Sequence, residues 1–131
     1  MLLVDANIFL ELFLGQERAE ECEKFLQKIS AGELEAIVSK FAIHAIEAVL
    51  NDSELILAFL RNVQGSVGLN VYETSIEEEM AASILMEKIK LDFDDAIQYY
   101  LAKNLGVEAI VSYDGHFDAV DIKRKEPSEF L

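Results

Sequence analysis

The stretch DFDDAIQYYL, residues 92–101, places three aspartates in the first four positions of a segment with the apolar spacing of a helix. One or two carboxylates at a helix start are ordinary, because they cap free N–H groups and complement the positive end of the helix dipole. Three so close together repel one another, and a bound cation would relieve that repulsion. We expect Asp92 to be the cap, Asp94 to lie in solvent, and Asp95, beside the apolar stripe, to point into a cleft.

Two further aspartates follow short apolar runs that predict buried strands. MLLVDA leads to Asp5 and VEAIVSYD ends at Asp114. Each aspartate alone is explained as a helix cap directly after a strand. The carboxyl ends of parallel strands, however, meet at one edge of a sheet, where functional groups gather. The two strand ends therefore predict a shared site.

A fourth carboxylate, Glu47, lies in the apolar run FAIHAIEAVL together with His44. Lys40, His44, Glu47 and Asn51 recur at helical spacing, so an ordinary polar helix face explains Glu47 slightly better than a place in the site. Four carboxylates around one cleft would need protonation or metal. Oxygen ligands suit Mg²⁺ or Mn²⁺, and such a cluster fits metal-assisted phosphoryl chemistry, in which ions activate water and stabilise the attacking and leaving oxygens.

Other chemistries lack their motifs. The sequence has no G-x-x-x-x-G-K-[ST], no G-x-G-x-x-G and no G-x-S-x-G. The two histidines, His44 and His116, do not have the spacing of a zinc site. We expect His116 to be a surface or rim residue and not a catalytic base.

The composition limits the class of protein and its partners. With 131 residues, 52% of them hydrophobic and 27% charged, the chain predicts one globular domain over residues 1–131. Its 11 Lys plus Arg and 25 Asp plus Glu give a net charge of −14, which opposes sequence-independent binding to nucleic acid. Either the substrate is not a polyanion, or bound metal and a local basic patch or partner overcome the repulsion.

The sequence favours a cytoplasmic location. The apolar stretches are too short and too interrupted to span a bilayer, and no basic segment precedes an apolar one as in a secretory signal. The single cysteine, Cys22, cannot form an internal disulfide, which fits a reducing compartment.

The elements that position these residues alternate along the chain. Ser75 and Glu78 form a capping box, which opens a helix with Ile76, Met80 and Ile84 on one face. We expect strands in MLLVDA, EAIVS, GLNVYE, VEAIVSYD and a last extended piece in DIKRKEP, with helices between them. Apolar strands that alternate with helices predict an α/β fold, a three-layer α/β/α sandwich with a mostly parallel central sheet of four to five strands.

On these residues the chain resembles the PIN-domain family, and specifically its small prokaryotic VapC-like toxin members, over essentially its full length. VDANIFLELF is similar to the family's opening hydrophobic-D-x-N segment, and the acid in AIEAVL matches the glutamate on the helix after the second strand. DDAIQYYLAKNLGVEAIVSYDGHF is similar to the family's D-A-hydrophobic helix and the following strand that ends in [TS]-x-D-x-x-F.

The resemblance implies Mg²⁺- or Mn²⁺-dependent cleavage of RNA phosphodiesters, frequent homodimers, and often an antitoxin protein that blocks the site. It implies metal-site acids at Asp5, Glu47, Asp95 and Asp114, with Asn7 and Ser112 at the supporting polar positions. One position departs from the pattern: many members carry a second aspartate where this chain has His116, and Asp118 is the candidate to replace it.

We therefore expect a metal-dependent endoribonuclease, the toxin of a toxin–antitoxin pair. The alternative is a catalytically weak PIN-fold module that binds a protein partner or RNA; the net charge and His116 favour it, and the intact four-acid set opposes it. A receiver-like phosphoacceptor domain would need a lysine at the end of a late strand, which VEAIVSYD does not supply.

Overall fold

A five-stranded, fully parallel sheet forms the centre of the molecule in the computed structural model, which describes residues 1–131. The strand order is β3-β2-β1-β4-β5, so β1 occupies the middle of the sheet between β2 and β4. The strands are β1 (Leu2–Val4), β2 (Ala36–Ser39), β3 (Leu69–Tyr72), β4 (Ala109–Val111) and β5 (Arg124–Lys125).

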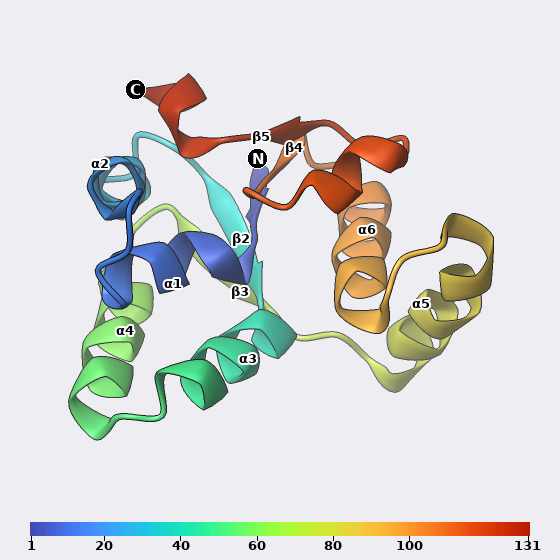
Figure 1. Cartoon of the computed structure of the whole chain (residues 1–131), viewed down its shortest axis with the longest axis horizontal. Helices are drawn as coiled ribbons and strands as arrows, with labels where there is room; N and C mark the ends of the chain where they lie inside the picture. Colours follow the sequence, from blue (N-terminus) through green and yellow to red (C-terminus); the bar gives the residue numbers. More distant parts are fainter.

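Helices cover both faces of this sheet. Figure 1 shows α1 to α4 on one side and α5 and α6 on the other, which confirms the predicted three-layer α/β/α sandwich. The helices are α1 (Ala6–Phe13), α2 (Ala19–Ser30), α3 (Lys40–Leu50), α4 (Ser53–Gly65), α5 (Ile76–Ile89) and α6 (Phe93–Leu105), with short 3₁₀ helices η1 (Gly115–Ala119) and η2 (Pro127–Phe130) near the C-terminus. None of the helices is both long and apolar enough to cross a membrane.

Alternate residues of the central strands pack into two separate cores. Leu2 and Val4 join the larger core under α1 to α4, whereas Leu3 joins the smaller core under α6. In the larger core, Phe9 and Phe59 pack edge to face with ring centroids 5.4 Å apart. A strand buried on both faces needs apolar residues at every position, which explains the continuous apolar runs in the sequence.

Side-chain caps start the helices at the positions that the sequence predicts. Ser75 and Glu78 form the expected capping box at α5. Asp92 accepts a hydrogen bond from the backbone N–H of Asp95 at 3.1 Å and is the cap of α6, while Asp94 is exposed. Because Asp92 does the capping, the carboxylate of Asp95 is left for other contacts.

The predicted apolar face of α5 is present, but it faces solvent. Ile76, Met80 and Ile84 are 70%, 61% and 66% exposed, and Ala82 is the buried residue of this helix. The helix packs against its neighbour α6 at the outside of the molecule (Figure 1). The spacing correctly places the three residues on one face, but spacing alone does not say what covers that face.

Candidate functional site

Asp5 lies directly after the central strand β1 and is almost completely surrounded by hydrogen-bond donors. Its Oδ1 accepts from the backbone N–H of Ala6 at 2.7 Å and from the amide of Gln98 at 3.3 Å. Its Oδ2 accepts from the hydroxyl of Ser112 at 2.6 Å and from the amide of Asn7 at 3.2 Å. Burial nevertheless raises the pKa of Asp5, against the opposing effect of these hydrogen bonds. Its carboxylate is therefore fixed in place by the protein.

Ser112 and Asn7 connect the ends of the two central strands. The Ser112 hydroxyl oxygen accepts from the Asn7 amide at 3.1 Å and from the backbone N–H of Asp114 at 2.9 Å. The Asn7 carbonyl accepts from the backbone N–H of Tyr113 at 3.4 Å. The structure thus places Asn7 and Ser112 between Asp5 and Asp114, where they hold the carboxyl ends of β1 and β4 together.

Asp95 and Asp114 meet at the side chain of His116. The Nδ1 atom of His116 lies 3.2 Å from Oδ2 of Asp95 and 3.2 Å from Oδ1 of Asp114. One potential ligand atom from each of the three residues lies within 4.8 Å of the others. Asp95 is only 6% exposed, whereas the His116 side chain is 72% exposed and borders the cluster on its solvent side. This places His116 at the rim, as expected from the sequence.

The electrostatics of this cluster favour a cation. Burial, followed by the nearby charge of Asp114, raises the pKa of Asp95 from its ordinary 3.8 to about 6, although the hydrogen bond with His116 acts in the opposite direction. The same hydrogen bond to Asp95, together with the charge of Asp114, raises the pKa of His116. The Asp95 carboxylate is thus buried beside a second negative charge, and a divalent cation would neutralise this excess.

Gln98 belongs to the site although the sequence reasoning did not select it. It is 2% exposed, it donates from Nε2 to Asp5, and its Oε1 has no hydrogen-bond partner in the protein. The contact with Asp5 fixes which end of the Gln98 amide is the nitrogen. If the amide were turned the other way round, its oxygen would face the Asp5 carboxylate and repel it. One feature of the sequence could have indicated Gln98. It is a polar residue within the apolar stripe of the helix, three positions after Asp95 and therefore on the same helix face.

Two predicted residues make their contacts elsewhere. The carboxylate of Glu47, on α3, lies 2.9 Å from Nδ1 of His44, and no hydrogen bond or ion pair joins it to the aspartates. Asp118 accepts from the guanidinium of Arg124 at 2.9 and 3.2 Å. Asp118 is therefore directed toward β5, and it is His116 that contacts Asp95 and Asp114.

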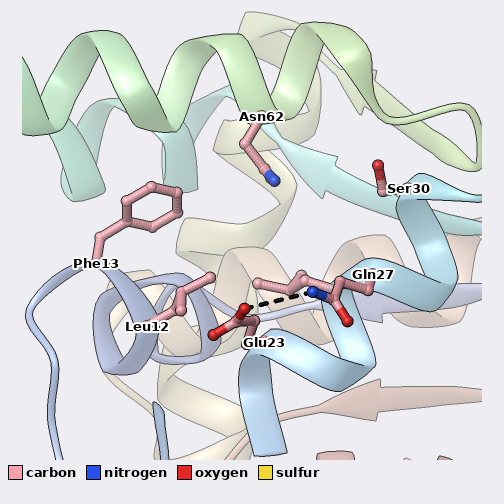
Figure 2. Close-up of a pocket in the computed structure, with 7 residues that line it drawn as sticks. Leu12, Phe13, Glu23, Gln27, Ser30 and Asn62 are labelled. Atoms are coloured by element: carbon pink, nitrogen blue, oxygen red, sulfur yellow. Dashed lines mark hydrogen bonds between the residues drawn. The ribbon is translucent and has the colours of Figure 1, made fainter. Parts of the chain in front are cut away.

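The surface beside the cluster is slightly hollowed. A hollow of about 210 Å³ is lined by residues that include Lys90, Asp92, Asp95 and His116. A different hollow of about 420 Å³ lies between α1, α2 and α4, and Figure 2 shows the side chains around it, with Asn62 opposite the hydrogen-bonded pair Glu23 and Gln27. No site aspartate lines the larger hollow, so it is separate from the candidate site.

The donor set fits a divalent cation. Asp95 and Asp114 offer carboxylate oxygens and His116 offers a ring nitrogen. Beside them, Gln98 binds Asp5 through its amide nitrogen and keeps a buried carbonyl oxygen that has no donor in the protein. A buried acceptor without a partner costs about 1–3 kcal/mol, which a cation or its hydration shell would recover. Asn7 and Ser112 orient the neighbouring groups, as outer hydrogen bonds do around metal ligands.

Comparison with known proteins places this geometry in a family. The fold is similar to that of VapC20 from Mycobacterium tuberculosis, described as a sarcin-ricin loop cleaving toxin, at a TM-score of 0.77 and 16% identity, over 93% of this chain and 96% of that one. It is also similar to a toxin–antitoxin complex from Klebsiella pneumoniae, at a TM-score of 0.74 and 17% identity, over 97% and 98% of the two chains. No curated protein sequence gives a significant match. The sequence model of the PIN domain matches residues 2–123, and the chain therefore belongs to the PIN domain family.

Proposed function

We propose that this chain is a divalent-metal-dependent endoribonuclease that hydrolyses RNA phosphodiester bonds as a single domain. The observation that carries the proposal is the convergence of Asp95, Asp114 and His116, whose ligand atoms lie within 4.8 Å of one another, beside the buried Asp5. Membership of the PIN domain family supports it, as does the likeness to a toxin that cleaves the sarcin-ricin loop.

The roles follow from the contacts. Asp95 and Asp114 would hold Mg²⁺ or Mn²⁺, with Asp5 at the same site. The role of Glu47, as a further ligand or to orient water, is carried by the family resemblance alone, since its carboxylate contacts His44. A bound ion supplies Lewis-acid activation of water and stabilisation of the leaving oxygen. Ser112 and Asn7 keep the Asp5 carboxylate and the Asp114 backbone in position through their shared hydrogen bonds.

An antitoxin protein is the proposed regulatory partner. One structural neighbour is a toxin–antitoxin complex, which supports this assignment. The product of the adjacent reading frame, co-expressed with the chain, should co-purify with it and suppress its RNA cleavage. Co-purification without any effect on cleavage would contradict the regulatory role.

A homodimer is the second proposed assembly, and the exposed face of α5 supports it. The apolar residues Ile76, Met80 and Ile84 lie between an acidic first turn, with Glu77, and a last turn with Lys88. In two antiparallel copies related by a twofold axis, the acidic first turn of each α5 would oppose the C-terminal end of the other, where Lys88 and the cap residue Lys90 outnumber Glu87. The face is therefore complementary to itself in both hydrophobicity and charge.

The experiment that separates an enzyme from a binding module uses single-stranded RNA with Mn²⁺, Mg²⁺ or EDTA. We expect cleavage with a divalent ion, no cleavage in EDTA, and none with Asp95→Asn. RNA binding without cleavage under every divalent ion would favour the alternative, a catalytically weak PIN-fold module that binds RNA or a protein partner.

A further inference from the structure

We propose that His116 is itself a metal ligand and that its nitrogen makes the site prefer a first-row transition ion such as Mn²⁺ over Mg²⁺. This inference rests on the proposed metal-dependent function. It adds the identity of a third ligand and, through that ligand, the class of cation that the site selects.

The position of the His116 ring carries the first step. Its Nδ1 is 3.2 Å from an oxygen of Asp95 and 3.2 Å from an oxygen of Asp114. Ligands of a divalent ion lie about 2.0–2.2 Å from it, which places adjacent ligands of an octahedral ion about 3 Å apart. Both distances from His116 are those of neighbouring ligands of one ion, and one ligand atom from each of the three residues lies within 4.8 Å of the others.

A second, independent observation is the carbonyl of Gln98, a buried acceptor without a partner on a side chain that contacts the site carboxylate Asp5. Gln98 reaches the site from α6, one turn beyond Asp95, and its amide nitrogen binds Asp5. Its Oε1 is buried and accepts no hydrogen bond from the protein. All other buried side-chain polar atoms of the site have partners, so the missing partner of Oε1 is a cation or donor from outside the chain.

The chemistry of the donor set sets the cation preference. Mg²⁺ prefers oxygen ligands and keeps several waters, whereas imidazole nitrogen favours first-row transition ions. Mn²⁺ shares the affinity of Mg²⁺ for carboxylate oxygen but, as a first-row transition ion, also binds imidazole nitrogen, so a set of two carboxylates and one imidazole favours Mn²⁺ over Mg²⁺. Replacing the imidazole by a carboxylate would return the site to an all-oxygen set, better suited to Mg²⁺.

Electron spin-echo spectroscopy of the Mn²⁺-loaded chain tests the ligand directly, because nitrogen bound to Mn²⁺ produces its own modulation. The sequence has only two histidines, so the signal can be assigned with His116→Asn and the matched control His44→Asn. We expect the nitrogen modulation in the wild type and in His44→Asn, and its loss in His116→Asn. Competition between Mn²⁺ and Mg²⁺ should show that His116→Asp loses roughly tenfold or more of the preference for Mn²⁺.

Other outcomes would overturn the inference. Bound Mn²⁺ without nitrogen modulation in the wild type would remove His116 from the ligand set, and continued RNA cleavage in that case would leave the proposed function intact. Loss of the modulation only in His44→Asn would place the ion at the Glu47–His44 pair. A wild type that binds no Mn²⁺ and cleaves no RNA under any divalent ion would contradict both the inference and the proposed function.

Discussion

At the residue scale, four donors surround the carboxylate of Asp5, whereas the carboxylates of Asp95 and Asp114 meet at one histidine. A carboxylate with all its acceptor positions engaged is oriented by the protein. The Asp95 carboxylate contacts only the His116 ring, and Asp114 accepts from the backbone N–H of His116 at 2.9 Å besides contacting that ring. Each can therefore bind a cation while losing few hydrogen bonds. The three aspartates therefore differ in how freely they can bind a cation. Asp5 is held by the protein, whereas Asp95 and Asp114 are better placed to act as metal ligands.

Ser112 is the residue on which this orientation depends most. Ser112→Ala removes the donor to Asp5 and leaves the backbone N–H of Asp114 without its acceptor. We expect the free energy of unfolding to fall by about 1–3 kcal/mol, measured by urea denaturation. The increase in midpoint temperature on adding Mn²⁺ should also shrink.

Ser66→Ala is the matched control for this substitution. Ser66 is also buried, but its hydroxyl makes a single hydrogen bond to the carbonyl of Asn62, away from the site. The control should lose about 1 kcal/mol and keep the full response to Mn²⁺. A Ser112→Ala protein that behaves like this control would mean that Ser112 does not organise the site.

The raised pKa of Asp95 predicts how the metal-free fold responds to pH. Its pKa is about 6 in the folded chain and 3.8 ordinarily, so folding favours the protonated form. The stability contributed in this way is fully present below pH 3.8 and is lost as the pH rises through 6. In chelator, lowering the pH from 7.5 to 5 should therefore raise the free energy of unfolding by about 1 kcal/mol.

Asp95→Asn identifies the source of this pH dependence. The variant should lack most of the increase and, at pH 7.5 in chelator, be at least as stable as the wild type, because it buries no charge. Asp118→Asn serves as the control and should keep the increase, since Arg124 lowers the pKa of Asp118. An Asp95→Asn chain clearly less stable than the wild type would show that the carboxylate stabilises the fold.

The residue scale is also where prediction from sequence reached its limit. The strand ends and the helix start predicted Asp5, Asp95 and Asp114 as site residues, because those positions follow from local pattern. The partners of Glu47 and Asp118 depend on which neighbour each side chain meets, His44 and Arg124 in the structure. Gln98 meets Asp5, and His116 meets Asp95, only because the fold brings distant segments together. A local sequence pattern does not show such contacts.

At the element scale, helix caps and strand periodicity were sufficient to predict the alternation of strands and helices. Asp92, Ser75 and the apolar strands each predict structure through local physics, the satisfaction of free N–H groups and burial on two faces. The strand order β3-β2-β1-β4-β5 requires long-range pairing, and the sequence gives no direct signal for it. The sequence pattern also could not predict that the apolar face of α5 is exposed to solvent. The spacing shows which residues share a face, but not what that face contacts.

Met80→Glu tests whether α5 forms the homodimer interface. The charge would enter the middle of the apolar face and weaken self-association, so the mass from light scattering should change from dimer to monomer. Leu57→Glu, which replaces an exposed apolar residue on α4, should leave the dimer intact. A wild type that is monomeric at all concentrations, or a dimer insensitive to Met80→Glu, would contradict this interface.

At the scale of the whole molecule, the net charge of −14 has to be reconciled with an RNA substrate. Acidic residues are concentrated in the first turns of α2 and α5, at Glu20 and Glu21 and at Glu77 to Glu79. Four of the 11 basic residues are already paired with acids: Lys103 with Asp121, Arg124 with Asp118, Arg18 with Glu126 and Lys24 with Glu20. The remaining basic residues are far outnumbered by the 25 acidic ones, so bound metal must supply much of the attraction to phosphates.

This charge distribution predicts a shallow salt dependence of RNA binding. Each phosphate contact releases counterions, so a few contacts give a slope of roughly −2 to −3 in a plot of log affinity against log salt concentration. The measurement is the affinity for single-stranded RNA in Mn²⁺, from low to physiological salt concentration. It is made with the wild type and with Asp95→Asn. A steep slope, typical of a basic binding surface, would show that protein cations and not metal dominate the interaction.

The rate of RNA cleavage as a function of Mn²⁺ concentration, in the wild type and in Asp114→Asn, tests the central claim most directly. Asp114 lies three residues after the end of β4, where it caps η1, and its carboxylate contacts His116. We predict a rate that rises with Mn²⁺ and saturates in the wild type and in Glu54→Gln, a control for loss of one exposed charge, and falls at least about 100-fold in Asp114→Asn. Equal rates in the wild type and Asp114→Asn, or cleavage that persists in EDTA, would contradict a metal-dependent nuclease centred on these carboxylates.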